Sequence, residues 1–215
     1  QTLSIDVFDI PGADGAFADI VSGPRAIAFT PDGDYALMVN AASEDVLVVD
    51  ARTRLQVGLV RPLHGDFPEG LVLSPDGTRA YVEEHGQAVV ATVEGPPIRR
   101  TLSDPMPPKL RLGQRLFYSA NSDEHPITRN HWVACASCHP DGREDSLTWA
   151  TPAGPRQTIM LAGRQTSSAP YGWAGKHDNL PDYVAETFTR LGGSGVKGDD
   201  LDQLLTYVQG VAGPT

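Results

Sequence analysis

Cysteine is scarce in this chain of 215 residues, which contains only Cys135 and Cys138. Two cysteines cannot build the framework of several disulfides on which small secreted scaffolds depend. Long apolar runs are also absent, since no stretch approaches the roughly 20 apolar residues that a membrane-spanning helix needs. No charged-then-apolar segment opens the chain. We therefore expect any export signal to have been removed or to lie upstream.

Basic residues are outnumbered, mainly in the first half of the chain. Residues 1–100 contain 7 Lys and Arg against 15 Asp and Glu, a net charge of −8, whereas residues 101–215 contain 10 against 12, a net charge of −2. An acidic surface repels phosphates and anionic lipids. Nucleic acids and membrane surfaces are therefore not expected as partners, and we expect the surplus of acidic groups mainly to aid solubility.

The first hundred residues contain an internal repeat. Residues 23–33 recur as residues 67–77, at a spacing of 44. In each copy an apolar segment precedes a Pro-Asp-Gly turn, in which proline fixes φ and glycine accepts a positive φ. A second and a third strand are predicted after each turn, at 35–40 and 46–50 in the first copy and at 79–83 and 88–93 in the second.

A period in the forties with several short strands per unit is typical of a β-propeller blade. Thr-Pro-Asp-Gly at residues 30–33, Ser-Pro-Asp-Gly at 74–77 and Ala-Tyr-Val at 80–82 resemble the YVTN-type propeller repeats of surface and periplasmic proteins. An unrelated antiparallel sheet is the alternative.

The N-terminal segment is similar to the end of a blade, because residues 4–9 match residues 45–50. We therefore expect the chain to begin within a blade, to hold about two and a half blades and to be the C-terminal part of a longer exported protein. The missing blades are expected upstream or from another copy of the chain. Bare strand edges favour association, so self-association through the open propeller edges is also expected.

Proline marks the end of the repeats. Residues 96–108 are predicted to be a stiff linker between a propeller domain at 1–95 and a second domain at 109–215, because five prolines interrupt any regular element. These prolines are Pro96, Pro97, Pro105, Pro107 and Pro108.

The apolar periodicity is helical beyond the linker. Three helices are predicted, around residues 112–117, 180–191 and 201–208. In the third helix Asp200 is the predicted N-terminal cap, with Gln203 at the reciprocal position of a capping box. The second domain is therefore predicted to be mostly α-helical, with long loops.

The segment Cys135-Ala136-Ser137-Cys138-His139 has the strongest chemical signal in the chain. Two thiols three residues apart can each add to one vinyl group of the same porphyrin, and the histidine that follows can bind the iron from one side. The motif predicts one covalently attached haem c, with His139 as the proximal iron ligand.

Two other interpretations of this motif stay open. A Cys-x-x-Cys pair can be a thioredoxin-like redox couple, although that couple is expected in a βαβ context, which the sequence lacks. The pair can also be half of a zinc site, with His125 and His131 as the remaining ligands.

The surroundings of the motif resemble those in cytochrome c domains. Residues 112–118 are similar to the first helix of such domains, in which a small residue and an aromatic one four positions apart let another helix cross closely; Tyr207-Val208 resembles the crossing partner. More specifically, residues 109–210 resemble the bacterial di-haem cytochrome c peroxidase and methylamine-utilisation family. The segments with this resemblance are 112–118, 133–139, 154–158 and 169–175.

The chain departs from that family at points that matter for the iron. The family's peroxidases use two haems per chain, whereas this chain encodes one motif. The Met that often follows the family's Pro-Tyr pair as the second axial ligand is replaced by Gly172, and no His lies between Pro140 and Lys176. The sixth iron ligand therefore cannot be taken from the resemblance.

Elimination suggests an order of candidates for this sixth ligand. Among the three methionines only Met160 follows the motif, since Met38 lies in the predicted propeller and Met106 in the linker. Core packing is the alternative role of Met160. His177 is the second candidate and His131 the third.

Further residues are expected to contact the haem. Arg156 and Arg164 can pair with its propionates, because guanidinium binds carboxylates in a bidentate manner. Trp149 and Trp173 can pack on the porphyrin. The alternatives are a solvated arginine and an aromatic residue of the core.

Together these observations predict a mixed protein, a partial β-propeller followed by a mostly α-helical cytochrome c domain, which transfers electrons to or from a redox protein partner. One alternative is half of a di-haem cytochrome c peroxidase-like enzyme whose other haem lies upstream. Another is a binding module, in which the propeller captures a partner and the haem senses redox state. Covalent haem attachment and the propeller resemblance both indicate a periplasmic or cell-surface location.

Overall fold

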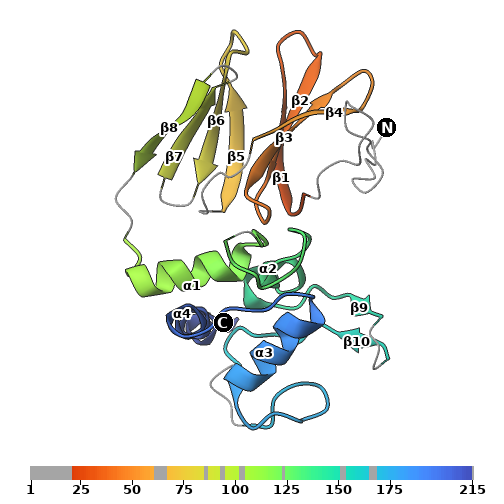
Figure 1. Cartoon of the computed structure of the whole chain (residues 1–215), viewed down its shortest axis with the longest axis vertical. Helices are drawn as coiled ribbons and strands as arrows, with labels where there is room; N and C mark the ends of the chain where they lie inside the picture. Colours follow the sequence, from red (N-terminus) through yellow and green to blue (C-terminus); the bar gives the residue numbers. More distant parts are fainter. Residues whose placement is uncertain are drawn as a thin grey trace. The chain divides into compact units, whose positions relative to one another are not determined.

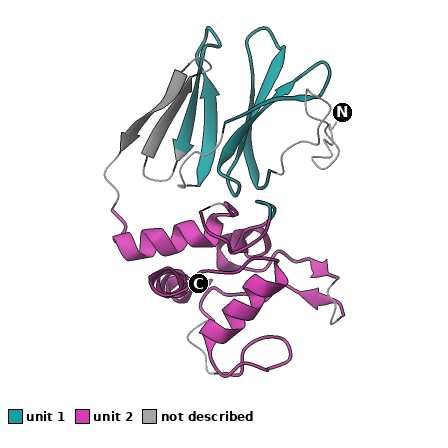
Figure 2. Ribbon diagram, in the orientation of Figure 1, with its two compact units in different colours: residues 1–104, 130–132 teal, residues 105–129, 133–215 magenta. Residues whose placement is uncertain are grey.

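The computed structural model describes residues 21–60, 67–84, 87–92, 95–101, 105–122, 124–150, 154–164 and 169–214. The chain divides into two units, which are described separately (Figure 2). Unit 1 comprises residues 1–104 and 130–132, and unit 2 comprises residues 105–129 and 133–215. Within the described ranges, no helix has the length and apolar character needed to cross a membrane.

The described residues of unit 1 form two antiparallel sheets of four strands each, in which every strand pairs with its neighbour in sequence (Figure 1). The first strands begin at Pro24 and Pro68, which confirms the predicted spacing of 44 residues. Four-stranded sheets repeated in this way have the strand order of propeller blades. The predicted half blade around residues 4–9 lies outside the described residues. The strands are β1 (Pro24–Phe29), β2 (Tyr35–Asn40), β3 (Asp45–Asp50), β4 (Gln56–Val60), β5 (Pro68–Leu73), β6 (Arg79–Glu84), β7 (Gln87–Thr92) and β8 (Gly95–Thr101).

Strand β8 corrects the predicted linker. Residues 95–101 pair with β7, so the first part of the segment 96–108 belongs to the second sheet, and the boundary between the units falls after residue 104. Pro96 and Pro97 have no N–H to donate, which a central strand does not tolerate but an edge strand does. Both prolines lie at the irregularity between Val90 and Thr92, on the last strand of the sheet.

The two Pro-Asp-Gly turns have the same hydrogen bonds. In the second turn the Gly77 N–H donates to the Ser74 carbonyl at 2.9 Å, and the Ser74 hydroxyl donates to Asp76 Oδ1 at 2.6 Å. The corresponding bonds in the first turn join Gly33 to Thr30 at 2.8 Å and Thr30 to Asp32 at 2.5 Å. The Ser74 hydroxyl is the main cause that lowers the pKa of Asp76 to about 2. Because the pKa of Asp76 is lower in the folded state, the ionised carboxylate stabilises the fold above pH 3.8, its ordinary pKa. This stabilisation is lost as the pH falls through about 2.

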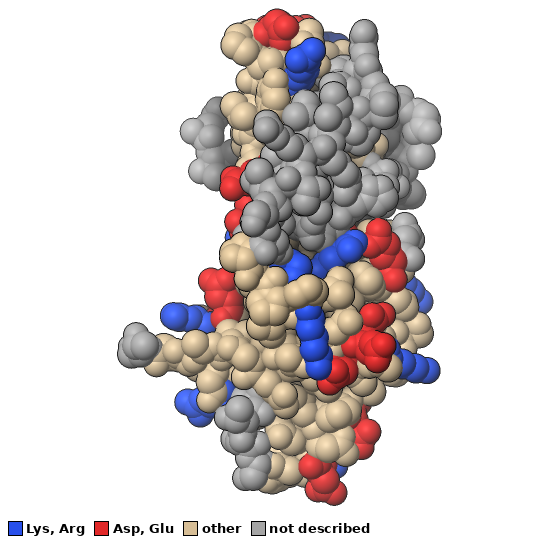
Figure 3. Space-filling model, turned by 90° about the vertical axis from the view of Figure 1, so that its left-hand side faces the viewer, with Lys and Arg blue, Asp and Glu red and all other residues tan. Residues whose placement is uncertain are grey.

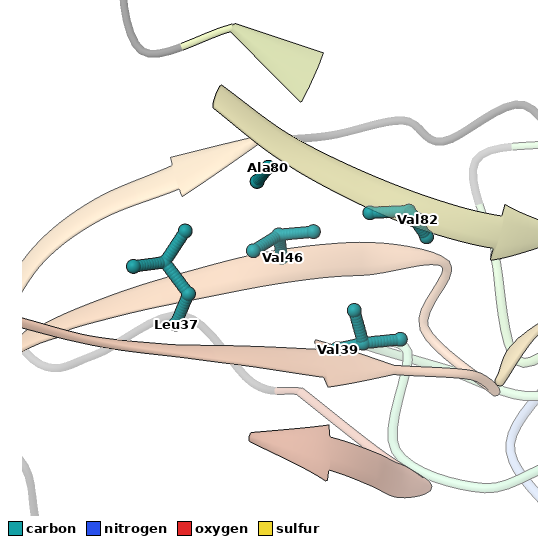
Figure 4. Close-up of a cluster of buried hydrophobic side chains, with 5 residues drawn as sticks. All are labelled: Leu37, Val39, Val46, Ala80 and Val82. Atoms are coloured by element: carbon teal, nitrogen blue, oxygen red, sulfur yellow. The ribbon is translucent and has the colours of Figure 1, made fainter. Parts of the chain in front are cut away.

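The two sheets share an apolar core, which Figure 4 shows. Leu37, Val39 and Val46 of the first sheet pack with Ala80 and Val82 of the second, and all five are buried. Alternate residues of a strand point to the same face, so each sheet directs apolar side chains at the other. Burying one valine or leucine side chain fully contributes about 1.5–3 kcal/mol, so this core stabilises the contact between the two sheets.

The outer faces of the same sheets expose apolar side chains. Ala26 of β1 packs against the shared core. Ile27 and Phe29 of the same strand point to the opposite face, where their side chains are 52% and 59% exposed. Val72 of β5 is 60% exposed. The predicted self-association therefore has an apolar surface to use. Light scattering during gel filtration is expected to show a mass that rises with concentration, and Phe29→Asp should reduce it; a monomer at every concentration would contradict this prediction.

Gly77→Ala is expected to destabilise unit 1 more than Gly33→Ala. Both glycines have positive φ, 71° and 77°, where an L-residue costs about 1–2 kcal/mol. A methyl group on Gly77 would also lie 2.7 Å from Pro31 Cδ of the other turn, whereas nothing lies within 4 Å of one on Gly33. Overpacking of this kind adds about 1–3 kcal/mol. Urea unfolding measures both variants, and equal losses would show that the contact between the turns is unimportant.

Unit 2 contains four helices among its described residues, and the three predicted ones are all present. Asn179 caps α3, because its side-chain oxygen accepts from the Asp182 N–H at 2.9 Å. The predicted cap of α4 is wrong, because the helix begins at Asp199 after Gly198. Asp200 therefore lies inside the first turn, where its negative charge interacts favourably with the positive end of the helix dipole. The helices are α1 (Pro108–Tyr118), α2 (Cys135–Cys138), α3 (Leu180–Arg190) and α4 (Asp199–Gly210).

Candidate functional site

The Cys-x-x-Cys-His segment forms one short helical turn, α2, which His139 ends. The Ala134 N–H donates to the Ser137 hydroxyl at 3.0 Å, and the His139 N–H donates to the Cys135 carbonyl at 2.9 Å. Residues three apart on a helix are neighbours on its surface. The turn therefore places both thiols on one side of the helix, and His139 follows directly after them. Neither cysteine is in a disulfide.

The thiols have a low tendency to ionise. Burial raises the pKa of Cys135 to about 12, with the Cys138 thiol as a smaller cause. Burial also raises the pKa of Cys138, and the Asp145 carboxylate adds to this effect while Arg190 opposes it. A dithiol couple that exchanges disulfides needs the opposite environment, because its attacking thiol is ionised at a lowered pKa. The thioredoxin-like interpretation therefore gains no support here.

His139 is held as a neutral imidazole. Burial lowers its pKa, and the backbone of Arg143, the backbone of Ile159 and the Asp145 carboxylate act in the opposite direction. Its Nδ1 atom is buried, and no hydrogen-bond partner for this atom is present among the described residues. A neutral imidazole has the free lone pair that a metal ion requires.

The loop after His139 brings the Met160 segment beside it. The Gly142 carbonyl accepts hydrogen bonds from the N–H groups of Leu161 and Ala162, both at 2.8 Å. Gly142 has φ of 74° and is buried, so the chain turns at a residue that a side chain would strain. Met160 is half-buried and follows Ile159, whose backbone lies near the His139 ring. The role of Met160 as an iron ligand stays a prediction.

Arg156 and Trp173, both predicted from the sequence, lie together. Arg156 belongs to the strand β10 (Arg156–Gln157), which pairs with β9 (Thr148–Trp149). The guanidinium carbon of Arg156 lies 5.9 Å from the centre of the Trp173 ring, and the Trp173 indole donates to the Gln157 carbonyl at 3.0 Å. Trp173 is 57% exposed. The two residues thus form an exposed aromatic surface with a cation over it, as a cation–π pair does.

Asp145 is a residue that the sequence interpretation did not include. Its Oδ2 accepts from the Trp149 indole at 2.8 Å, and its Oδ1 accepts from the Leu147 N–H at 2.9 Å. Burial acts to raise the pKa of Asp145, but these two donors and the Thr158 hydroxyl together lower it below its ordinary value. The carboxylate is therefore ionised at neutral pH. In the sequence, the only indication of a role for Asp145 is its position six residues after His139.

The histidines proposed as alternative ligands lie in different surroundings. His177 Nε2 lies 2.5 Å from the Glu186 carboxylate, and its ring lies 5.6 Å from the Tyr183 ring. His131 is buried and belongs to unit 1, where its carbonyl accepts from the Ser22 hydroxyl at 2.7 Å. His125 Nε2 lies 3.8 Å from Glu124. Over the part of the chain that the structure describes, no three His, Cys, Asp or Glu side chains gather as metal ligands would, so the zinc interpretation gains no support.

Helices α1 and α4 cross closely at Gly113. A methyl group there would overlap the Gln203 carbonyl oxygen and lie 2.7 Å from Tyr207 Cβ. Phe117, one turn further along α1, lies 5.5 Å from Tyr207 between ring centres. This small-then-aromatic pair against Tyr207 is the crossing that the sequence predicts.

Charged side chains of both signs alternate over the described surface on the face drawn in Figure 3. One ion pair joins α1 to α4, with Lys109 Nζ 2.5 Å from Asp202 Oδ2.

No protein-family model matches the chain, and a search of curated proteins finds no significant match. Solved structures with local similarity include hydrazine synthase from Kuenenia stuttgartiensis, with 25% identity over 47% of this chain and 28% of that one and a TM-score of 0.34. Periplasmic gluconolactonase PpgL from Pseudomonas aeruginosa gives 23% identity, 45% and 34% coverage and a TM-score of 0.31.

The β-propeller domain of Cps50 (Swd1) from Myceliophteria thermophila gives 22% identity, 33% and 22% coverage and a TM-score of 0.29. The chain thus spans between 22% and 34% of these three structures. Such low global scores carry no weight for function. The assignment of blade-like sheets rests instead on the strand order and the repeat.

Proposed function

We propose that this chain is a c-type haem protein that transfers electrons. Cys135 and Cys138 would supply the thiols for covalent attachment, and His139 the proximal iron ligand. When bound, haem supplies a one-electron couple between ferrous and ferric iron. The partner in this proposal is a redox protein, and the proposed location is the periplasm or the cell surface.

The arrangement of α2 and His139 is the observation that supports this proposal most. Two free thiols lie one helical turn apart, both with raised pKa values, directly before a half-buried imidazole whose pKa is lowered. Haem attachment consumes both thiols and the imidazole lone pair, so this donor set fits haem c.

Exposed apolar side chains in the same unit as the motif would support a planar group. Leu147 and Trp173 of unit 2 are 54% and 57% exposed. Arg156 beside Trp173 offers a guanidinium for a propionate. With haem bound, Trp173 would exclude water from the porphyrin and Arg156 would neutralise a propionate carboxylate.

Met160 remains the proposed sixth ligand, followed by His177 and His131. Met160 belongs to the same unit as the motif, and its segment is anchored to the Gly142 carbonyl. The ring of His177 is already paired with Glu186, and His131 is in unit 1. A thioether opposite His139 would raise the reduction potential.

Optical spectroscopy of the full chain, produced in a host that attaches haem c, tests the proposal. The expected result is a reduced c-type spectrum, one haem per chain by pyridine haemochrome and no reaction with peroxide. A weak far-red band of Met-ligated ferric iron would support Met160. A high-spin spectrum that changes on peroxide titration would favour the peroxidase-like alternative. Absence of haem under these conditions would overturn the proposal, and bound zinc by elemental analysis would replace it.

A further inference from the structure

The two sheets of unit 1 present the same face in two different environments. Sheet 1 (β1–β4) has Ile27 and Phe29 on its outer face, where they are 52% and 59% exposed. At the repeat spacing of 44 residues, their equivalents in sheet 2 (β5–β8) are Leu71 and Leu73. These two leucines are half-buried and pack into the core that the sheets share. The face that is exposed on sheet 1 is therefore the face by which sheet 2 binds a neighbouring sheet.

The strand pairing supports this equivalence. Leu71 lies opposite Val82 on one face of sheet 2, and Val82 is buried in the shared core. In sheet 1 the equivalent residues, Ile27 and Met38, also lie opposite each other. Met38, however, packs against Leu47 in a separate apolar cluster. The outer face of sheet 1 is therefore apolar across β1, β2 and β3.

The outer face of sheet 2 corresponds to the face that sheet 1 directs at the shared core. Val72 and Tyr81 lie opposite each other on this outer face and are 60% and 39% exposed. Their repeat equivalents in sheet 1 are Ala28 and Leu37, which are also paired. Leu37 is a buried member of the shared core. The two outer faces are thus the two halves of one further contact between sheets.

We propose that a second copy of this chain binds head to tail, with the outer face of its sheet 2 packed on the outer face of sheet 1. The contact repeats the one inside a single chain, since Val72 and Tyr81 take the places of Ala28 and Leu37. The two outer faces both point away from the shared core, on opposite sides of the pair of sheets, so they meet only between copies. Such a heterologous contact generates rings or open chains. A closed propeller has roughly 4–8 blades, so about two to four copies of the two sheets complete a ring.

One position distinguishes this contact from the internal one. Glu83 follows Tyr81 by two residues on β6, so it lies on the same outer face. Its repeat equivalent, Val39, is fully buried in the shared core. A carboxylate loses water on entering an apolar contact, which weakens the contact. The association is therefore expected to be reversible, and Glu83→Val, which restores the residue of the first repeat, is expected to tighten it by about tenfold.

Mixing two variants of the full chain tests which faces meet. Phe29→Asp places a charge on the outer face of sheet 1, and Val72→Asp places one on the outer face of sheet 2. Each variant alone is expected to be a monomer by light scattering during gel filtration, because the contact needs both faces. An equimolar mixture is expected to form a dimer through the one intact face of each variant. This dimer grows no further, because both of its remaining faces carry Asp.

Arg52→Asp is the matched control, since it adds a carboxylate in the turn after β3, outside both faces, and should leave the association unchanged. Circular dichroism shows whether each variant is folded, and Phe29→Ser with Val72→Ser replaces the pair if an Asp variant does not fold. Association that is lost in Phe29→Asp but kept in Val72→Asp would overturn the proposal, because sheet 1 would then pair with itself. A monomeric parent chain at every concentration, or folded variants that stay monomeric when mixed, would also overturn it.

Discussion

Replacement of both Cys135 and Cys138 by alanine is expected to abolish covalently bound haem, whereas either single replacement should leave weaker attachment through one thioether. The reason is that α2 presents both thiols from one turn, so each would bond to a different vinyl group of one porphyrin. Haem staining on a denaturing gel and the intact mass of the chain measure the loss. Normal covalent haem in the double variant would disprove the assigned roles.

Ser137→Ala is the matched control for these variants. It lies between the same two cysteines and removes only a hydroxyl that accepts from the Ala134 N–H. Loss of such a capping bond costs about 1 kcal/mol, which weakens the turn but leaves both thiols in place. Covalent haem should therefore persist in this variant. If Ser137→Ala lost haem as completely as the double variant, disturbance of the turn would explain both results.

Gly113→Ala is expected to lower the free energy of unfolding of unit 2 by about 2 kcal/mol. Alanine gains about 1 kcal/mol over glycine inside a helix. Against this, its methyl group would overlap the Gln203 carbonyl and touch Tyr207 Cβ at 2.7 Å, and neither is the movable end of a side chain. Overpacking of up to about 3 kcal/mol exceeds the gain in helix propensity. Urea unfolding followed by circular dichroism measures the difference.

Gly210 offers a matched control for this second prediction. It is the last residue of α4, and no atom lies within 4 Å of a methyl group placed on it. Gly210→Ala should therefore be neutral or slightly stabilising. Equal behaviour of Gly113→Ala and Gly210→Ala would show that α1 and α4 do not cross as closely as the structure indicates.

Local signals in the sequence account for the parts of the fold that were predicted. The Pro-Asp-Gly turns contain their own donors and acceptors, since Ser74 and Asp76 bond within four residues of one another. The 44-residue spacing then predicts the second sheet from the first. Helix α3 likewise has its start and stop signals in the sequence, with Pro181 in its first turn and Gly192 and Gly193 after its end.

Features that depend on tertiary position were missed. Pro96 and Pro97 predict a linker because proline has no N–H for a strand ladder. Both are compatible with β8 only because this strand lies at the edge of its sheet. Asp200 is of a residue type that is common at helix caps, but the helix begins at Asp199, so the cap position falls two residues earlier, on Gly198. Asp145 carries no motif, and its importance follows from three donors that the folded loop directs at it. The sixth ligand depends on the path of several loops, which no spacing rule describes.

Residues 130–132 belong to unit 1 although the chain on both sides of them belongs to unit 2. Neither unit is therefore a continuous stretch of polypeptide. A cut after residue 104 would release two pieces that are not the two units, because the first would lack the segment whose backbone Ser22 binds through His131. For recombination, this means that the two halves are not freely interchangeable modules: a graft that joins one to a foreign partner at residue 104 must also carry, or replace, these three residues.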